Sequence, residues 1–283
     1  MTILSVEHLC KRYPGFALED VSFSMERGTV MGFIGRNGAG KTTTIKSILR
    51  LVRPDSGRIT VCGMDAETHE REIRARIGYV SGSAAYYPRR RLRALTAVTA
   101  SFYPAWDSVR CAQLMQRFGL DEDKRVSELS EGMKVKYQLA LAMSHGAELL
   151  ILDEPTSGLD PVSRDELLQM FVQLCDKEGV SIFFSTHITT DLDACADRIT
   201  WLRDGRVAAS GPFDAFRAEY VLARGPEAQL TDALRAKLIG ATVRAGQAEG
   251  LLHAADAPLA AGLALQPADL TAIMVHLERE AEP

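Results

Sequence analysis

Residues 35–42 constrain this chain more than any other stretch, because they follow the pattern Gly, four residues, Gly-Lys-Thr. Residues 29–34 are mostly apolar and predict a short strand, while residues 43–49 carry apolar side chains at helical spacing. A glycine loop between a strand and a helix can surround an anion with backbone N–H groups and the positive helix end. An ordinary glycine-rich turn, the alternative, does not require that strand and helix. The pattern predicts a phosphate-binding loop.

This loop predicts specific roles for its side chains. Lys41 would neutralise the terminal phosphates of a nucleotide, and the hydroxyl of Thr42 would ligate Mg²⁺. The residues expected to hold the nucleotide here are Gly35, Arg36, Asn37, Gly38, Ala39, Gly40, Lys41, Thr42 and Thr43.

Composition excludes several classes of protein. The 283 residues carry a net charge of −4, which argues against a nucleic-acid binder that relies on bulk positive charge. No apolar run reaches the roughly 20 residues that span a bilayer, and residues 1–8 alternate like a strand rather than forming a signal peptide. The five cysteines are scattered without CxxC spacing, which favours reduced, structural cysteines in a cytosolic protein.

The order of patterns along the chain predicts an α/β fold. Residues 2–34 alternate like antiparallel strands around a turn, and the strand pattern stops at about residue 84 and resumes near 148. We therefore expect a P-loop NTPase core with an antiparallel β subdomain, in a domain of residues 1–212, and a helical insertion at about 84–147. Residues 213–283 carry no chemical motif and are expected to form a small C-terminal accessory domain.

Two carboxylates follow the apolar strand predicted at residues 148–152. Asp153 and Glu154 are costly at the end of a buried strand unless they meet a cation or take part in a reaction. The first suits Mg²⁺, and the second could polarise an attacking water. A strand that simply ends in solvent with charged residues is the alternative, and the phosphate loop upstream favours the functional interpretation.

Further residues occupy positions typical of ligand sites, each with a structural alternative. Tyr13 could stack on a purine base or pack half-buried beside its Pro-Gly turn. Ser130 can cap a helix and, with Gly132, offer an anion site, although most such caps bind nothing. Asp160 is expected to cap the helix that begins at the following proline. His187 ends a buried strand on the face where doubly wound sheets bind ligands, although a lone histidine is usually structural.

Taken in order, these motifs resemble those of the ATP-binding subunit of ABC transporters, over residues 6–212. Residues 35–42 match the Walker A motif, residues 149–154 match Walker B with its catalytic glutamate, and residues 129–133 (LSEGM) look like the LSGGQ signature. Residues 157–160 match the D-loop. Together with LSEGM, residues 102–107 and 273–279 resemble a bacterial subgroup of YtrB-like and drug- or bacitracin-export-type subunits.

The resemblance implies a function and partners. Two ATP-binding subunits, identical or different, would close head to tail around two ATP and power a separate transmembrane subunit, in the exporting direction for this subgroup. It implies that Glu154 polarises the attacking water and that His187 contacts the γ-phosphate. Lys41 and a Mg²⁺ held by Thr42 and Asp153 would take up charge.

The same resemblance gives roles to the remaining residues. Tyr13 would stack on the base, while Ser130, Gly132 and Asp160 would act on the nucleotide across the dimer. No nucleic acid is implied. The subunit would lie in the cytoplasm, peripherally on the inner face of the membrane, with a coupling segment of its partner near residues 81–107.

The sequence departs from the family at two places. Gly82 stands where the family usually has a glutamine, with Ser81 or Ser83 as substitutes, and Glu131 and Met133 replace Gly and Gln of the signature. These departures motivate one alternative, a nucleotide-sensing or regulatory module with little turnover. A soluble ABC ATPase without a transport role is the other.

The arginines at 89–93 indicate a solvated face, or contact with an acidic partner or lipid headgroups.

Overall fold

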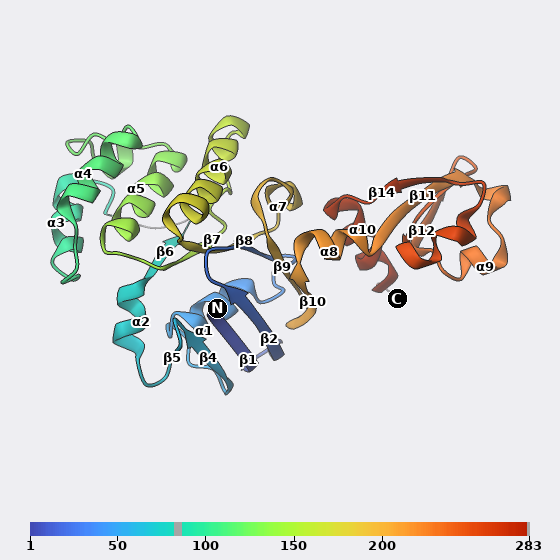
Figure 1. The fold of residues 1–283 in the computed structure, drawn as a ribbon, viewed down its shortest axis with the longest axis horizontal. Coiled ribbons are helices and arrows are strands. Elements are labelled where there is room, and N and C mark those ends of the chain that lie inside the picture. Colours follow the sequence, from blue (N-terminus) through green and yellow to red (C-terminus); the bar gives the residue numbers. More distant parts are fainter. Residues whose placement is uncertain (82–86, 282–283) are drawn as a thin grey trace. The chain divides into compact units, whose positions relative to one another are not determined.

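The computed structural model describes residues 1–81 and 87–281, which belong to two compact units, Met1–Ser210 and Gly211–Pro283 (Figure 1). The elements up to the end of the first unit are β1 (Thr2–Tyr13), β2 (Phe16–Glu26), β3 (Val30–Ile34), α1 (Lys41–Ile48), β4 (Ser56–Val61), β5 (Met64–Asp65), α2 (Glu70–Arg76), β6 (Ile77–Ser81), α3 (Leu92–Ala100), α4 (Ser108–Arg117), η1 (Val126–Glu128), α5 (Glu131–Ser144), β7 (Leu149–Asp153), α6 (Pro161–Glu178), β8 (Ser181–Thr186), α7 (Thr189–Cys195), β9 (Arg198–Arg203) and β10 (Arg206–Pro212).

A mainly parallel sheet forms the centre of the first unit, with strand order β10-β9-β3-β8-β7-β6. β3 pairs in parallel with β8 and β9, and β7 pairs in parallel with β6 and β8. Every residue of β3 and β8 is buried, as expected for parallel strands covered on both faces. Helices α5, α6 and α7 lie on one side of this sheet and α1 on the other (Figure 1). The predicted α/β class is confirmed.

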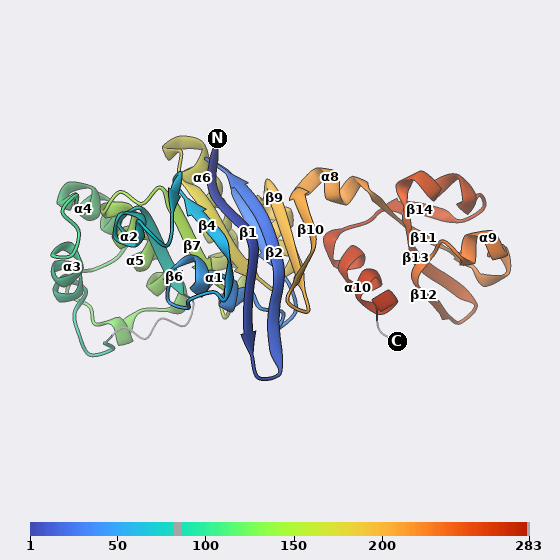
Figure 2. The ribbon, with the colours of Figure 1, turned by 90° about the horizontal axis from the view of Figure 1, so that it is seen from below.

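An antiparallel sheet, with order β2-β1-β4-β5, packs against this centre. In Figure 2, β1 and β2 form a long hairpin beside β4. Phe23 of β2 lies with its ring centroid 5.5 Å from that of Phe33 and 5.7 Å from that of Phe183. Burying three aromatic side chains in one cluster supplies a large apolar area, which joins the two sheets into one core.

Between β6 and β7, the described residues form helices. Ser130 caps α5 by accepting a hydrogen bond from the N–H of Met133, so this local prediction is confirmed. Tyr137 of α5 is buried, and its hydroxyl bonds to the hydroxyl of Thr96 at 2.9 Å and donates to the carbonyl of Leu92 at 3.1 Å. These bonds fix α5 against α3.

The second unit is built on an antiparallel sheet with order β12-β13-β11-β14. Its elements are α8 (Phe213–Ala218), β11 (Tyr220–Pro226), η2 (Glu227–Gln229), α9 (Asp232–Arg235), β12 (Ile239–Arg244), β13 (Gln247–His253), η3 (Ala254–Ala260), β14 (Ala264–Pro267) and α10 (Leu270–Ala281). A small apolar core contains Leu234, Leu238 and Leu252. On α10, the buried His276 donates from Nδ1 to the carbonyl of Gly240 at 2.8 Å, which ties this helix to β12.

Two expectations from composition can be compared with the structure. The five cysteines carry free thiols, and burial raises the pKa of Cys175 to about 12. Across residues 1–81 and 87–281, no helix combines the length and apolarity that crossing a membrane requires.

Candidate active site

The loop of residues 35–40 connects β3 to α1, and its glycines are required by the space around it. Gly40 precedes α1 with a φ of 110°, a conformation that L side chains rarely adopt. A Cβ on Gly35 would lie 2.3 Å from the carbonyl oxygen of Leu202, a backbone atom that cannot move aside. The backbone can therefore follow this path only with glycine at both positions.

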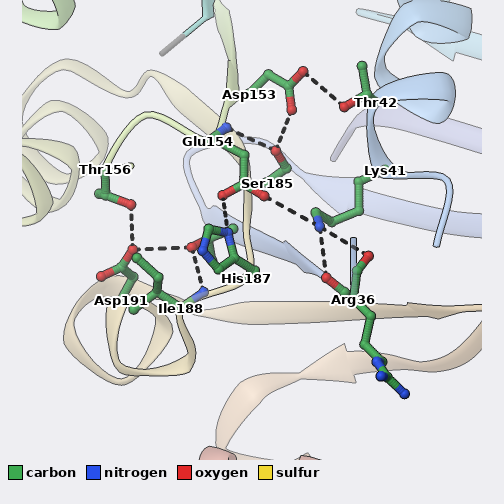
Figure 3. A network of polar contacts seen from close by, with 12 residues as sticks. Arg36, Lys41, Thr42, Asp153, Glu154, Thr156, Ser185, His187, Ile188 and Asp191 are labelled. Atoms are coloured by element: carbon green, nitrogen blue, oxygen red, sulfur yellow. Dashed lines mark hydrogen bonds and ion pairs between the residues drawn. The ribbon is translucent and has the colours of Figure 1, made fainter. Parts of the chain in front are cut away.

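The side chain of Lys41 points into this loop (Figure 3). It is 7% exposed, and Nζ donates to the carbonyl of Gly35 at 2.7 Å and reaches that of Arg36 at 3.5 Å. Nζ also lies 3.4 Å from Oε1 of Glu154. A nearly buried ammonium thus connects the phosphate loop to the carboxylate that follows β7.

Asp153 ends β7 beside the start of α1. Its Oδ2 accepts a hydrogen bond from the Thr42 hydroxyl at 3.3 Å, and its Oδ1 accepts one from the Ser185 hydroxyl at 2.7 Å. Carboxylate and hydroxyl oxygens are hard ligands of the kind that Mg²⁺ prefers. In the described part of the chain, no group of three or more His, Cys, Asp or Glu residues could hold a metal.

Glu154 has an unusual backbone conformation, with a φ of 52°. Its N–H group donates to both the carbonyl and the hydroxyl oxygen of Ser185, at 3.2 and 3.1 Å. Its Oε2 accepts from Nδ1 of His187 at 2.7 Å (Figure 3). A non-glycine residue in this region costs about 1–3 kcal/mol and persists where the surroundings fix it, which is common at functional sites.

A cleft of about 720 Å³, within the usual range of small-molecule sites, brings together Lys41, Glu154 and His187. Asp153 is not among its lining residues and is connected to it through Thr42. Its lining residues are Gly15, Phe16, Arg36, Asn37, Gly38, Gly40, Lys41, Thr42, Thr43, Glu154, Ser157 and His187. The predicted Gly35 contributes its carbonyl to Lys41, and Ala39 is buried, with its carbonyl bonded to the N–H of Gly205 at 3.1 Å.

Three residues that line the cleft, Gly15, Phe16 and Ser157, were not predicted as site residues, and on the first hairpin the sequence favoured Tyr13 instead. Tyr13 ends β1, is 42% exposed, and has the Lys11 ammonium 5.7 Å from its ring centroid. It is not among the residues that line the described cleft, whereas Phe16, its cross-strand partner, is. The only sequence signal for Phe16 was that an aromatic residue stands on each side of the Pro-Gly turn. Base stacking by Tyr13 stays a prediction.

Ser130, Gly132 and Asp160 are not among the residues that line this cleft. A Cβ on Gly132 would lie 3.6 Å from Cβ of Ser163, whose hydroxyl donates to Asp160 at 2.6 Å. This hydroxyl and the N–H groups at the start of α6 lower the pKa of Asp160. The signature segment and the D-loop are therefore neighbours. Glu131 pairs with Lys134 at 2.6 Å, which offsets its added charge.

Gly82 and Ser83, at the position of the family's glutamine, lie outside the described residues. Ser81, the last residue of β6, is held by the side chain of the buried Gln138 on α5. Oε1 of Gln138 accepts from the Ser81 N–H at 3.1 Å, and Nε2 donates to the Ser81 carbonyl at 3.2 Å. The amide side chain of Gln138 thus fixes the end of β6 to α5, the helix that begins in the signature segment.

Comparison with known proteins agrees with this geometry. The family profile described as "ABC transporter" matches residues 18–157. The chain is 32% identical to the bacitracin transport ATP-binding protein BcrA of Bacillus licheniformis, over 75% of this chain and 71% of BcrA. It is also 32% identical to the ABC transporter ATP-binding protein YtrB of Bacillus subtilis, over 72% and 70% of the two chains.

A solved ATP-binding subunit of an ABC transporter is 31% identical and superimposes with a TM-score of 0.69, covering 76% of this chain and 92% of its own. The predicted P-loop NTPase core, with its antiparallel sheet and helical portion, is confirmed by this likeness. The chain therefore belongs to the ABC transporter family, as one of its ATP-binding subunits.

Proposed function

We propose that this subunit hydrolyses ATP in the cleft between the phosphate loop and the end of β7. The observation that carries the proposal is the position of Glu154, whose carboxylate lies 3.4 Å from the Lys41 ammonium and 2.7 Å from Nδ1 of His187. A carboxylate held beside a phosphate-binding cation is placed to accept a proton from a water that attacks the γ-phosphate.

Residues of this chain can carry out each step of the proposed hydrolysis. The loop amides and Lys41 bind the phosphates, and Glu154 takes the proton as the water oxygen bonds to the γ-phosphorus. The bond between the γ-phosphorus and the bridging oxygen breaks, giving ADP and phosphate, while His187 orients Glu154. A Mg²⁺ held by Thr42 and Asp153 would neutralise phosphate charge when bound.

Phosphate release from the purified chain tests the proposal. We expect steady phosphate release with ATP and Mg²⁺ and a loss of most of this activity when EDTA removes the metal, because Thr42 and Asp153 then lack the ion that neutralises the phosphates. ATP bound by the wild-type chain without phosphate release would favour a nucleotide-sensing module instead.

We further propose that a second ATP-binding subunit completes each site. Ser130 and Gly132 stand at the start of α5, where N–H groups and the helix dipole favour an anion, yet they are not among the residues that line the chain's own cleft. A partner subunit packed head to tail would present the same segment to this cleft. Asp160, next to the signature segment, would lie at that junction.

A groove on the first unit is the proposed docking site for a coupling segment of a transmembrane subunit. Its volume is about 270 Å³, and its lining residues are Leu49, Leu51, Arg74, Ile77, Tyr79, Thr99, Tyr103, Gln138, Leu141, Ala142 and His145. Leu51 and Tyr79 are exposed large hydrophobic residues, at 59% and 38%. A short apolar segment of the transmembrane subunit would cover them, and this docking would hold the subunit peripherally on the cytoplasmic face.

Replacing Leu51 by Arg is expected to reduce co-purification of a transmembrane protein with the tagged chain from detergent-solubilised native membranes, because a charged side chain would replace an exposed apolar one that the docked segment covers. Val109→Arg, on α4 and 69% exposed, is the matched control and should leave recovery unchanged. Equal loss in both variants would argue against the groove.

The arginine cluster can be tested in the same assay. Arg91 and Arg93 both pair with Asp123, so Arg89 and Arg90 are the two to replace.

The subgroup resemblance favours an exporter, and the identity of the co-purified membrane protein would test that direction.

A further inference from the structure

The carboxylate of Asp191 connects three segments around the proposed active site. Asp191 lies on α7, and its side chain is 1% exposed. Its Oδ2 accepts hydrogen bonds from the hydroxyl of Thr156 at 2.6 Å and from that of Thr186 at 3.2 Å (Figure 3). Its Oδ1 lies 3.8 Å from Nε of Arg164, in the first turns of α6.

Burying a carboxylate is costly unless it is paired and hydrogen-bonded. Burial raises the pKa of Asp191, while the hydrogen bonds from Thr156 and Thr186 and the positive charge of Arg164 act against that rise. A hydrophobic residue would hold α7 on the sheet without this cost. The carboxylate therefore indicates a need for its specific hydrogen bonds.

Both hydroxyl donors flank residues of the proposed reaction. Thr156 is two residues after Glu154, and Thr186 immediately precedes His187. The Thr186 hydroxyl also accepts from the N–H of Ile188 at 2.9 Å, which fixes the turn that contains His187. One oxygen atom of Asp191 thus bonds to the loop of the carboxylate and to the loop of the histidine.

We propose that Asp191 is a positioning residue for the hydrolysis of ATP. Its carboxylate holds the segment Glu154–Thr156 and the segment Thr186–Ile188 at the separation that lets His187 orient Glu154. The inference rests on the proposed function, because it concerns the rate of that reaction. It predicts an effect on turnover and little effect on nucleotide binding, since the ammonium of Lys41 bonds to the carbonyl of Gly35 and lies beside Glu154 rather than Asp191.

Thr156→Val tests this with the smallest change, because valine keeps the shape and removes the hydroxyl. We expect kcat for phosphate release to fall about 10- to 100-fold with KM for ATP nearly unchanged, since a small displacement of reacting groups slows a reaction strongly. Thr156→Ser restores the hydroxyl and should return kcat to within about twofold of wild type.

Thr200→Val is the matched control. Thr200 is also buried, and its hydroxyl bonds to that of Ser210 at 2.9 Å, away from the cleft. This variant should lower the melting temperature without lowering kcat. Dividing turnover by the concentration of ATP-binding sites removes the effect of unfolded protein. Should Thr156→Val not fold, Asp191→Asn is expected to give the same separation of kcat from KM.

The outcomes distinguish this inference from the proposed function. An active wild-type chain with unchanged kcat in Thr156→Val, or with an equal loss in Thr200→Val, overturns the positioning role alone. A wild-type chain that releases no phosphate overturns the proposed function and the inference that rests on it.

Discussion

Replacing Glu154 by Gln is expected to lower the rate of ATP hydrolysis by about 10²–10⁴-fold, the range that a general base contributes. Glutamine has the same shape, and its single amide oxygen can still accept a hydrogen bond from Lys41 or from His187, but it cannot accept a proton from water. ATP affinity should hold or rise, because a negative charge 3.4 Å from Lys41 is removed from a site that binds phosphates. Phosphate release and ATP titration measure the two effects separately.

Glu148→Gln is the control for this variant, since it makes the same change just before β7 begins. Glu148 pairs with Arg27 and Arg76 and does not line the described cleft, so its turnover should match wild type. Wild-type turnover by Glu154→Gln would show that another group takes the proton.

Replacing Lys41 by Ala is expected to weaken ATP binding about 10- to 100-fold, since a hydrogen bond to a charged group is worth about 1.5–3 kcal/mol. Lys41 is 7% exposed, reaches two loop carbonyls and is the one lysine of residues 35–42, so the loop has no second ammonium to take its place. Its loss also leaves Glu154 without this cation, which adds repulsion toward phosphates.

Titration with a fluorescent ATP analogue checks this prediction. Lys46→Ala is the control, because Lys46 is an exposed cation in the last turn of the same helix, α1. Its affinity should equal that of wild type. An unchanged affinity in Lys41→Ala would show that the phosphates bind elsewhere.

Local signals explain what the sequence predicted well. Asp160 and Pro161 predicted the start of a helix, and α6 runs from Pro161 to Glu178 with Asp160 as its cap. The strand β8 was predicted from its apolar run, and its end placed His187 at the ligand face of the sheet. Capping and burial leave a pattern in neighbouring residues, so one sequence is enough.

Tertiary contacts explain what the sequence missed. Phe16 lines the cleft because the β1–β2 hairpin points toward the phosphate loop. The sequence predicts the turn between the two strands, but residue spacing does not give the direction in which the hairpin points. The bonds of Asp191 join residues 35 and 5 positions away along the chain, so a lone acid after His187 gave no signal. The strands of the second unit are short and partly exposed, which weakens their alternation.

The amide bonds between Gln138 and Ser81 have a mechanical consequence. α5 cannot rotate against the central sheet without either carrying the end of β6 along or losing both bonds. Gln138 also lines the groove proposed for the membrane subunit. In the proposed assembly, a force applied at that groove would therefore reach Ser130 through α5, and with it the surface that we propose faces the nucleotide of a second subunit.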